Sequence, residues 1–386
     1  MNRKTILSFV EQAKLFFGED FIPLHRPMFE GNERQYLIDC IDSNFVSSVG
    51  KKVTELEEKV AEFTGSKYAV ATVNGTAALH VAIKLAGVKP GDEVISQALT
   101  FIATCNAISY AGAKPLFVDV DVDTMGLSPA ALKRFLEENA EKKMSGTFNK
   151  TSGKKISACI PMHTFGFPCR IAEIAEICSD WGIALVEDAA ESLGSYADNC
   201  HTGSFSKIAT LSFNGNKIIT TGGGGMIVTD DEELAKRAKH ITTTAKVPHA
   251  YEFVHDEIGY NYRMPNINAA LGCAQMEQLD EFLNIKTQLA NQWDKFFSDR
   301  GVIFVKALDG NKANHWLNTI ILDSRDDRDE FLKLTNANNV MTRPIWTLMS
   351  KLPMFKSCQT DKLENSLWLE DRVVNIPSSV PNRNIE

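Results

Sequence analysis

Residues 171–188 read IAEIAEICSDWGIALVED, and this stretch decides the fold class. Apolar residues recur at helical spacing over 171–181, and the run at 184–187 that follows is apolar on both faces. Strands with two apolar faces are typical of a sheet that is covered by helices on both sides. The stretch therefore predicts a helix followed by a buried strand, which is the repeating unit of an α/β protein with a mostly parallel sheet.

The same alternation extends in both directions, and we expect a seven-stranded type of sheet sandwiched by helices. We predict further strands at 68–73, 93–97, 116–119, 157–162, 218–221 and 226–229, and further helices at 76–86, 102–108 and 128–139. The last two strands would form a hairpin around four consecutive glycines. The polar stretch 141–155 predicts an exposed insertion.

A smaller second domain is expected toward the C-terminus. A long helical region at 268–297 precedes strands near 302–306 and 316–322 and a helix at 326–336. The apolar spacing over residues 6–17 predicts an amphipathic N-terminal helix that packs on the protein. We therefore divide the chain into an N-terminal helix and arm, a large domain, and a connecting helix with a small α/β domain, at residues 1–30, 31–265 and 266–386.

Composition excludes several classes of function. The 386 residues carry a formal net charge of -8, which argues against a nucleic-acid surface because phosphate binding needs clustered cations. The eight cysteines form no C-x-x-C pair, and the eight histidines show no metal-ligand spacing, so we expect reduced thiols, a cytoplasmic protein and no metal site. No segment approaches the ~20 apolar residues that a membrane span requires.

Chemistry is expected where strands end, because ligands of parallel sheets gather at the carboxyl ends of the strands. The first such end runs into Asn74-Gly-Thr-Ala-Ala78, which opens a helix. The free N–H groups of a helix N-terminus form a ready anion site. The motif is also compatible with a plain turn between strand and helix.

A second strand ends in Glu187-Asp-Ala-Ala-Glu191. A carboxylate at this position could bind a metal, cap a helix or hold a cationic ring nitrogen. The third motif is Ser212-Phe-Asn-Gly-Asn-Lys217, followed by Ile218 and an apolar run. Burial disfavours the charged form of an amine and makes it nucleophilic, as Schiff-base chemistry requires. Lys217 is therefore a candidate nucleophile.

Taken together, the motifs resemble the sugar aminotransferase (DegT/StrS) family of fold-type I pyridoxal-phosphate (PLP) enzymes. The resemblance runs from about Phe21 to Pro377 and includes a further motif, Gly259-Tyr-Asn-Tyr-Arg263. More narrowly, Ile22-Pro-Leu-His-Arg-Pro27 and Phe45-Val-Ser-Ser-Val-Gly50 resemble the aminotransferases of the legionaminic-acid and bacillosamine pathways. Those enzymes act on a UDP-linked 4-keto-6-deoxy-N-acetylhexosamine.

The resemblance implies a set of cofactor contacts. Lys217 would hold PLP as a Schiff base, and Asp188 would keep the pyridine nitrogen protonated. Phe101 would stack on the ring, unless it is ordinary core packing, and Glu191 would lie beside the cofactor hydroxyl, where many relatives have Gln. Pyridoxamine phosphate would be the aminated form of the cofactor. The implied cofactor-binding residues are Gly75, Thr76, Ala77, Phe101, Asp188, Glu191, Ser212, Lys217 and Asn261, and the catalytic ones are Lys217 and Asp188.

The resemblance also implies two substrates and a partner. L-glutamate would donate the amine and a nucleotide-linked sugar would accept it. Asn261 would reach the phosphate site of a neighbouring subunit, so that a homodimer shares its active sites. His163 could instead be a satisfied core histidine, and Arg263 a structural ion pair. The implied substrate contacts are Ser47, Ser48, His163, Asn216, Arg263, Arg343 and Trp346.

Three other functions are alternatives to a sugar aminotransferase. A PLP-dependent sugar dehydratase of the same fold would have histidine in place of Lys217. A nucleotide-sugar-binding protein without catalysis would not need Lys217, Asp188 and Ser212 together. A dinucleotide-dependent dehydrogenase would need G-x-G-x-x-G after its first strand, and the motif at Asn74 does not supply it.

Overall fold

The computed structural model describes residues 1–18 and 20–381 and shows an α/β protein built on a seven-stranded sheet. The strand order is β1-β11-β10-β7-β6-β2-β3, and only β11 runs antiparallel to its neighbours. The predicted mostly parallel, seven-stranded sheet is confirmed. The strands are β1 (Tyr68–Thr72), β2 (Glu93–Gln97), β3 (Lys114–Val118), β6 (Ile156–Ile160), β7 (Ala184–Asp188), β10 (Ile208–Ser212) and β11 (Gly225–Thr229).

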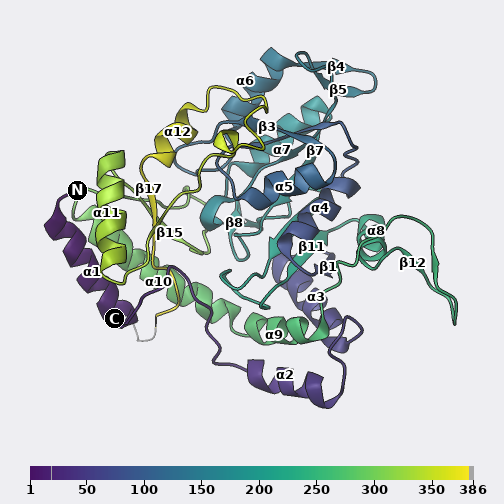
Figure 1. The fold of residues 1–386 in the computed structure, drawn as a ribbon, viewed down its shortest axis with the longest axis horizontal. Coiled ribbons are helices and arrows are strands. Elements are labelled where there is room, and N and C mark those ends of the chain that lie inside the picture. Colours follow the sequence, from purple (N-terminus) through teal and green to yellow (C-terminus); the bar gives the residue numbers. More distant parts are fainter. Residues whose placement is uncertain (19, 382–386) are drawn as a thin grey trace.

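Helices cover both faces of this sheet (Figure 1), which explains the two-sided apolar strands. One face is covered by α4 (Gly75–Leu85), α5 (Ile102–Tyr110) and α8 (Glu232–Thr242). The opposite face is covered by α3 (Lys51–Thr64), α6 (Pro129–Asn139), α7 (Ile171–Trp181) and α9 (Asn266–Met276). Successive residues of β1 face the two helix layers. Val70 packs against α4, whereas Ala71 packs toward α3.

The predicted strand at 218–221 is wrong. This segment is irregular, and the connection from β10 to β11 is a long buried loop. The segment folds back onto the end of β10, where the Thr221 N–H donates to the Phe213 carbonyl at 3.0 Å. Helix α9 holds it from the other side, because the Asn268 side chain donates to the Thr221 carbonyl at 2.8 Å. Tertiary contacts thus override the β-propensity of the Ile218-Ile-Thr-Thr221 run.

The C-terminal part forms a second, smaller sheet. Its strand order is β14-β15-β17-β16, and helix α11 packs against it. The helical region expected at 268–297 divides into α9 and α10 (Leu279–Ser298). The remaining elements here are β14 (Ile303–Phe304), β15 (Asn318–Ile321), α11 (Arg325–Ala337), β16 (Arg343–Pro344), the 3-10 turn η2 (Met349–Lys351), α12 (Glu364–Glu370) and β17 (Val373–Ile376).

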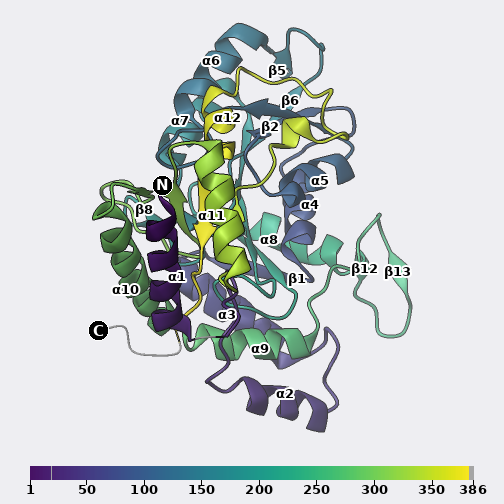
Figure 2. The same ribbon diagram turned by 60° about the vertical axis from the view of Figure 1, so that its left-hand side comes forward.

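The N-terminal helix α1 (Arg3–Phe17) belongs to this C-terminal unit. Figures 1 and 2 show it beside α10 and α11, and Phe9 stacks on Trp293 with ring centroids 5.1 Å apart. After the helix, the chain crosses the small unit, where Ile22 pairs with Val340 and the Leu24 carbonyl accepts from the Ser378 N–H at 2.8 Å. The predicted amphipathic helix is confirmed. Its partners come from the far end of the chain.

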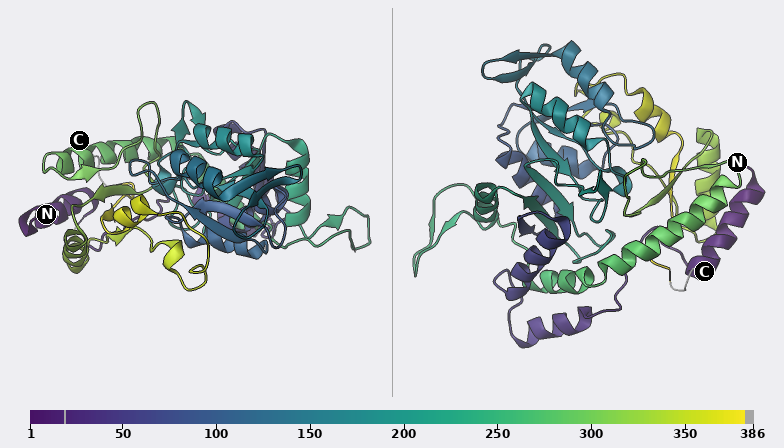
Figure 3. Two further views of the ribbon diagram at one scale, coloured as in Figure 1. Left: turned by 90° about the horizontal axis from the view of Figure 1, so that it is seen from above. Right: turned by 180° about the vertical axis from the view of Figure 1, so that it is seen from behind.

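Several segments extend from the body. Helix α2 (Glu33–Asp42) packs on α9 at the bottom of Figure 1. The hairpin of β12 (Lys246–Val247) and β13 (Val254–His255) projects away from the sheet (Figure 3). The expected insertion at 141–155 contains the hairpin of β4 (Ala140–Lys143) and β5 (Gly146–Asn149). The short elements β8 (Tyr196–Ala197), β9 (Cys200–His201) and η1 (Thr164–Gly166) lie near the sheet edge described next.

Candidate active site

The three predicted motifs meet at one edge of the large sheet. β1, β7 and β10 run in the same direction, so their carboxyl ends bring Asn74, Asp188 and Ser212 to this edge. β11 begins there with Gly225, and a Cβ at that position would lie 2.6 Å from the backbone of Asn74 and Gly75. Glycine at position 225 is therefore needed for the close approach of these two backbones.

The start of α4 forms an open cradle. Asn74 caps the helix, and its Oδ1 accepts from the Ala77 N–H at 2.8 Å. A Cβ on Gly75 would lie 2.9 Å from the Ser212 Cβ and 3.0 Å from its Oγ, so only glycine lets Ser212 lie this close to the start of the helix. Because the cap already occupies the Ala77 N–H, the donors left for an anion are the Gly75 and Thr76 N–H groups and the Ser212 hydroxyl.

Asp188 is a buried carboxylate at the end of β7. Its Oδ2 accepts from the Thr104 hydroxyl at 2.6 Å, and its Oδ1 accepts from the Ala190 N–H at 3.2 Å. Among the residues that the structure describes, no cation forms an ion pair with it. Burial raises the pKa of Asp188, while the Thr104 hydrogen bond and the nearby Lys217 act in the opposite direction. A cationic group placed at this carboxylate would relieve the cost of burial.

Lys217 lies in the loop between β10 and β11 and is largely buried, as expected. Its Nζ lies 3.3 Å from Glu191 Oε1, and the Trp316 ring covers it with the centroid 3.8 Å from Nζ. Glu191 is fixed by the Phe165 N–H, which donates to Oε2 at 2.8 Å. Burial raises the pKa of Glu191, and the Lys217 ammonium opposes this rise. The amine, the two carboxylates and the cradle thus lie together.

His163 does not face open space in this structure. Its ring is completely buried, with Nε2 3.1 Å from Glu187 Oε2 and Nδ1 accepting from the Cys169 N–H at 3.3 Å. Both ring nitrogens are engaged and the side chain has no exposed surface, which favours the alternative of a core histidine over a substrate contact.

The Glu187 side chain is the centre of that buried network. Its Oε2 accepts from the Gly203 N–H at 2.7 Å, and its Oε1 accepts from the Phe205 and Ser206 N–H groups, each at 2.8 Å. These bonds fix the loop that leads into β10. Glu187 and Asp188 are neighbours in one strand, so the network holds the strand end that presents Asp188.

Aromatic residues form one wall of the site. Phe101 precedes α5 and is 46% exposed, so it is not core packing. Its ring lies 6.1 Å from that of Trp346, which lies 4.7 Å from the ring of Phe165. Phe165 has a φ of 58°, a strained value for a non-glycine residue that turns its N–H toward Glu191. An exposed aromatic face here is available for stacking.

The remaining predicted contacts lie at the rim. Arg263 donates to Asn261 Oδ1 at 3.3 Å, and it has no carboxylate partner among the described residues, so the alternative of a structural ion pair is not seen. The chain around them lies beside the end of β1, where Thr72 pairs with Arg263. The other positions lie on exposed or half-buried loops and strands: Ser47, Ser48, Asn216 and Arg343.

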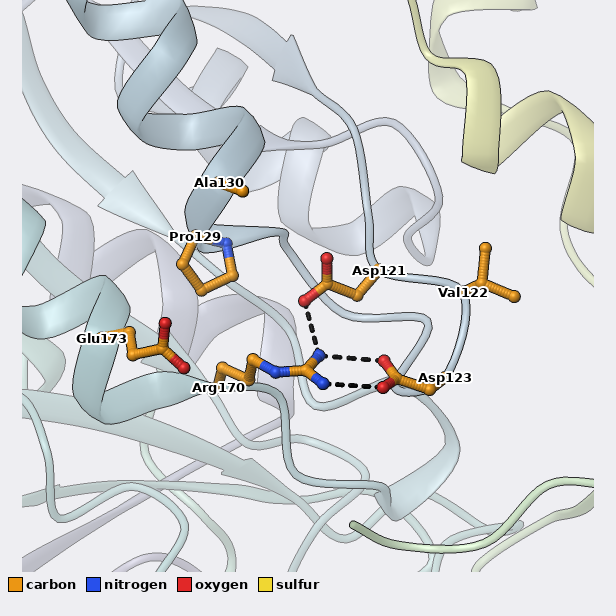
Figure 4. Close-up of a pocket in the computed structure, with 7 residues that line it drawn as sticks. All are labelled: Asp121, Val122, Asp123, Pro129, Ala130, Arg170 and Glu173. Carbon is orange, nitrogen blue, oxygen red and sulfur yellow. Dashed lines mark hydrogen bonds and ion pairs between the residues drawn. The ribbon is translucent and has the colours of Figure 1, made fainter.

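Two other groups of polar residues are explained by their own contacts. Figure 4 shows a surface pocket at the starts of α6 and α7, in which Arg170 donates to Asp121 and Asp123 at 2.6–2.9 Å. The cation there is already neutralised, and none of the predicted site residues lines this pocket. Near α8, the exposed His240, Asp256 and Glu257 lie within metal-binding reach of one another, but His240 pairs with Asp256 at 2.7 Å and Glu257 with Arg237.

The described residues fit the cofactor that the sequence suggested. A largely buried amine can take up a carbonyl group, and a buried carboxylate without a cationic partner can hold a protonated ring nitrogen. The cradle of Gly75, Thr76 and Ser212 suits a phosphate, and Phe101 offers a stacking face. Each chemical part of PLP thus has a counterpart.

Comparisons with known proteins agree with this fit. Residues 27–382 match the model of the DegT/DnrJ/EryC1/StrS aminotransferase family. The chain is 38% identical over 335 residues to the Bacillus subtilis putative pyridoxal phosphate-dependent aminotransferase EpsN, covering 86% of this chain and 84% of the relative. It is 36% identical over 361 residues to GDP-perosamine synthase of Escherichia coli O157:H7, covering 93% of each.

A solved structure shows the same fold. The Helicobacter pylori aminotransferase PseC, involved in the biosynthesis of pseudoaminic acid, superposes with a TM-score of 0.83 at 20% identity over 92% of this chain and 93% of that chain. Within the described residues, no helix is both long and apolar enough to cross a membrane.

Proposed function

Since the chain belongs to the DegT/DnrJ/EryC1/StrS aminotransferase family, we propose that it moves an amino group from L-glutamate to the 4-keto carbon of a nucleotide-linked sugar. The sugar we propose is a UDP-linked 4-keto-6-deoxy-N-acetylhexosamine, a precursor in nonulosonic-acid or bacillosamine-type glycan synthesis. The family is PLP-dependent. The observation that carries the proposal is the meeting of Lys217, Glu191 and Asp188 at the sheet edge, beside an open anion cradle.

Each residue has a defined task in this reaction. PLP supplies an electron sink that stabilises negative charge on the substrate carbon. Asp188 holds the proton on the ring nitrogen, and its fixed bond to Thr104 sets its orientation. The Lys217 Nζ attaches the cofactor and, when free, moves a proton to or from the substrate carbon. Ser212 and the start of α4 anchor the phosphate end, which fixes the ring relative to Lys217.

The sugar assignment rests on the segments 22–27 and 45–50. Ser47 lies beside α9, where its carbonyl accepts from the Asn266 N–H at 2.8 Å, so the loop has a defined position at the rim. The name of GDP-perosamine synthase favours a different nucleotide for that relative. The name of PseC, by contrast, refers to a nonulosonic acid. Both UDP- and GDP-linked ketosugars therefore belong in the test.

We further propose a homodimer with shared active sites, located in the cytoplasm. Helix α2 and the β12–β13 hairpin both extend from the body (Figure 2). The helix and the loop after it carry Ile41 and Phe45, and the hairpin carries Tyr251 and Phe253, each at least 57% exposed. A second copy of the chain would cover such apolar surface. All eight cysteines are free, which suits a reducing compartment.

Product analysis tests the proposal. The purified protein with PLP is incubated with L-glutamate and either the UDP-linked or the GDP-linked 4-keto sugar, and the 4-amino sugar is identified by mass spectrometry and NMR. We expect amination of the UDP sugar and loss of the PLP absorbance band above ~400 nm when glutamate is added alone. If PLP gives no such band, the protein is a binding protein. If the sugar loses water instead of gaining an amine, it is a dehydratase.

A further inference from the structure

Trp316 connects the small domain directly to the reacting amine. It lies two residues before β15, is only 4% exposed, and places its ring centroid 3.8 Å from the Lys217 Nζ. No signal in the sequence pointed to it. The contact is one of a cation with the face of an indole, which attracts an ammonium electrostatically, most strongly where water is excluded.

The orientation of Trp316 is fixed from three sides. Its Nε1 donates to the Asn216 carbonyl at 2.5 Å, next to the reacting lysine. Its backbone N–H donates to Asn314 Oδ1 at 2.8 Å, and its carbonyl accepts from the Lys286 Nζ at 3.4 Å. Three hydrogen bonds around one residue leave the ring little freedom to move when the amine does.

The same network positions Glu191. The Asn314 side chain donates to the Glu191 and Leu193 carbonyls, each at 2.9 Å, while it accepts from Trp316. Asn314 thereby ties the indole face and the carboxylate together as one unit. The Lys217 ammonium lies in contact with both members of this unit, with Glu191 Oε1 at 3.3 Å.

We propose that Trp316 is a further catalytic residue, which together with Glu191 forms the binding position of the Lys217 ammonium whenever that amine is free. This inference rests on the proposed role of Lys217 as the amine that attaches the cofactor. An amine that is released and must return in every cycle needs a defined position near the site. The Glu191 carboxylate and the Trp316 indole face together define such a position for the free amine without forming a covalent bond to it.

Other charged groups also act on this amine. The carboxylates of Asp188 and Glu191 interact electrostatically with this amine, and so does the buried His25 ring. Lys286 lies beyond the Trp316 carbonyl and also acts on His25. A test must therefore separate Trp316 from a general change in this environment.

The test measures modification of Lys217 by an amine-specific reagent in full-length, cofactor-free protein across pH 6 to 11, with the labelled peptide quantified by mass spectrometry. The variants are Trp316→Leu, Trp316→Phe and Glu191→Gln. Trp293→Phe is the matched control, because Trp293 is also a buried tryptophan and donates its Nε1 to the Pro377 carbonyl at 3.1 Å. Thermal melting checks that each variant is folded.

We expect the pH of half-maximal labelling to fall by about one unit in Trp316→Leu, as the loss of a desolvated cation–π contact implies. Glu191→Gln shifts it in the same direction, Trp316→Phe less, and Trp293→Phe not at all. If Trp316 merely covers the lysine, Trp316→Leu raises the maximal rate of labelling and leaves the midpoint in place, which overturns the proposal. Should the leucine variant not fold, an unchanged midpoint in Trp316→Phe overturns it.

A failure of the role proposed for Trp316 can be distinguished from a failure of the proposed function. Borohydride reduction of the PLP-loaded protein, followed by peptide mapping, reports whether Lys217 attaches the cofactor at all. If another residue is labelled by reduction, the proposed function fails, whatever the midpoint in the cofactor-free variants. If Lys217 is labelled and the midpoint does not move, only the role of Trp316 fails.

Discussion

Two lysines are buried among the residues that the structure describes, and their surroundings differ. Lys217 lies in a loop at the sheet edge, with a carboxylate at 3.3 Å and an indole face at 3.8 Å. Lys286 lies within α10 and is completely buried, and within the described part of the chain it donates only to the carbonyls of Trp316 and Ser378. Burial lowers the pKa of Lys286 to about 7. Burial alone therefore does not mark a reactive lysine. Acidic partners and an adjoining open cradle distinguish Lys217.

Replacing Lys217 should have the largest effect. In Lys217→Ala we expect turnover of glutamate and ketosugar to fall by roughly 10⁴-fold, since removal of a single essential nucleophile has effects of this order. Steady-state rates and the melting temperature are measured together. Lys286→Ala serves as the comparison for a buried lysine that contacts neither Glu191 nor Asp188 among the described residues. Retention of full turnover in Lys217→Ala would show that Lys217 is not the amine that attaches the cofactor.

The acidic surroundings of Lys217 are tested by Asp188→Asn. The variant keeps the shape and the Thr104 contact but loses the negative charge that would face the ring nitrogen. We expect PLP affinity to fall about 10- to 100-fold, as for loss of a charge-assisted hydrogen bond. Absorbance titration with PLP measures it. Thr104→Val, which removes one neutral donor, should weaken binding much less, and equal losses in both variants would contradict the charge argument.

Lys286 is tested through the pH dependence of stability. Between pH 7 and about 10 the unfolded chain keeps a proton on this amine while the folded chain does not, so the free energy of unfolding gains up to ~1.4 kcal/mol per pH unit as pH rises. Lys286→Met removes this gain and should flatten the profile. Urea unfolding midpoints at pH 7, 8 and 9 measure it. An identical slope in wild type and variant would show that Lys286 stays charged in the fold.

The smallest effect on turnover and stability is expected for an exposed lysine on the protein surface. Lys236 is exposed on α8 and pairs with Glu232 at 2.9 Å and Glu233 at 3.1 Å. Exposed pairs of this sort contribute little because water screens them. Lys236→Ala should leave turnover and melting temperature within experimental error. A clear loss of stability would mean that the ion pairs on this helix matter more than their exposure indicates.

The sequence predicted most of the fold because the buried strands and amphipathic helices carry local patterns. The helix at 171–181 and the strand at 93–97 agree with the structure at both ends. The strand predicted at 218–221 is wrong, because the backbone groups of Thr221 form hydrogen bonds with Phe213 and with Asn268 of α9 and not with a neighbouring strand. Such tertiary contacts leave no periodic signal in the chain.

The candidate site was predictable only where its residues lie inside strand-end motifs. Asp188, Ser212 and Lys217 follow directly from such motifs. Thr104 could not be recognised, because a threonine within a helix gives no sign that it faces a carboxylate 84 positions away. Trp316 was missed for a similar reason, since it reaches Lys217 from a loop 99 positions further along the chain. His163 shares its position at a strand end with functional residues, and only its burial shows that it serves the network around Glu187.

The packing of α1 has a consequence for how the chain is made. This helix is synthesised long before its apolar partners on α10, α11 and β17. Its Phe9 and Phe16 must therefore remain uncovered until those partners have been made. Chaperone binding to the nascent chain is expected to centre on this helix, and the C-terminal unit can pack only after synthesis has passed β17.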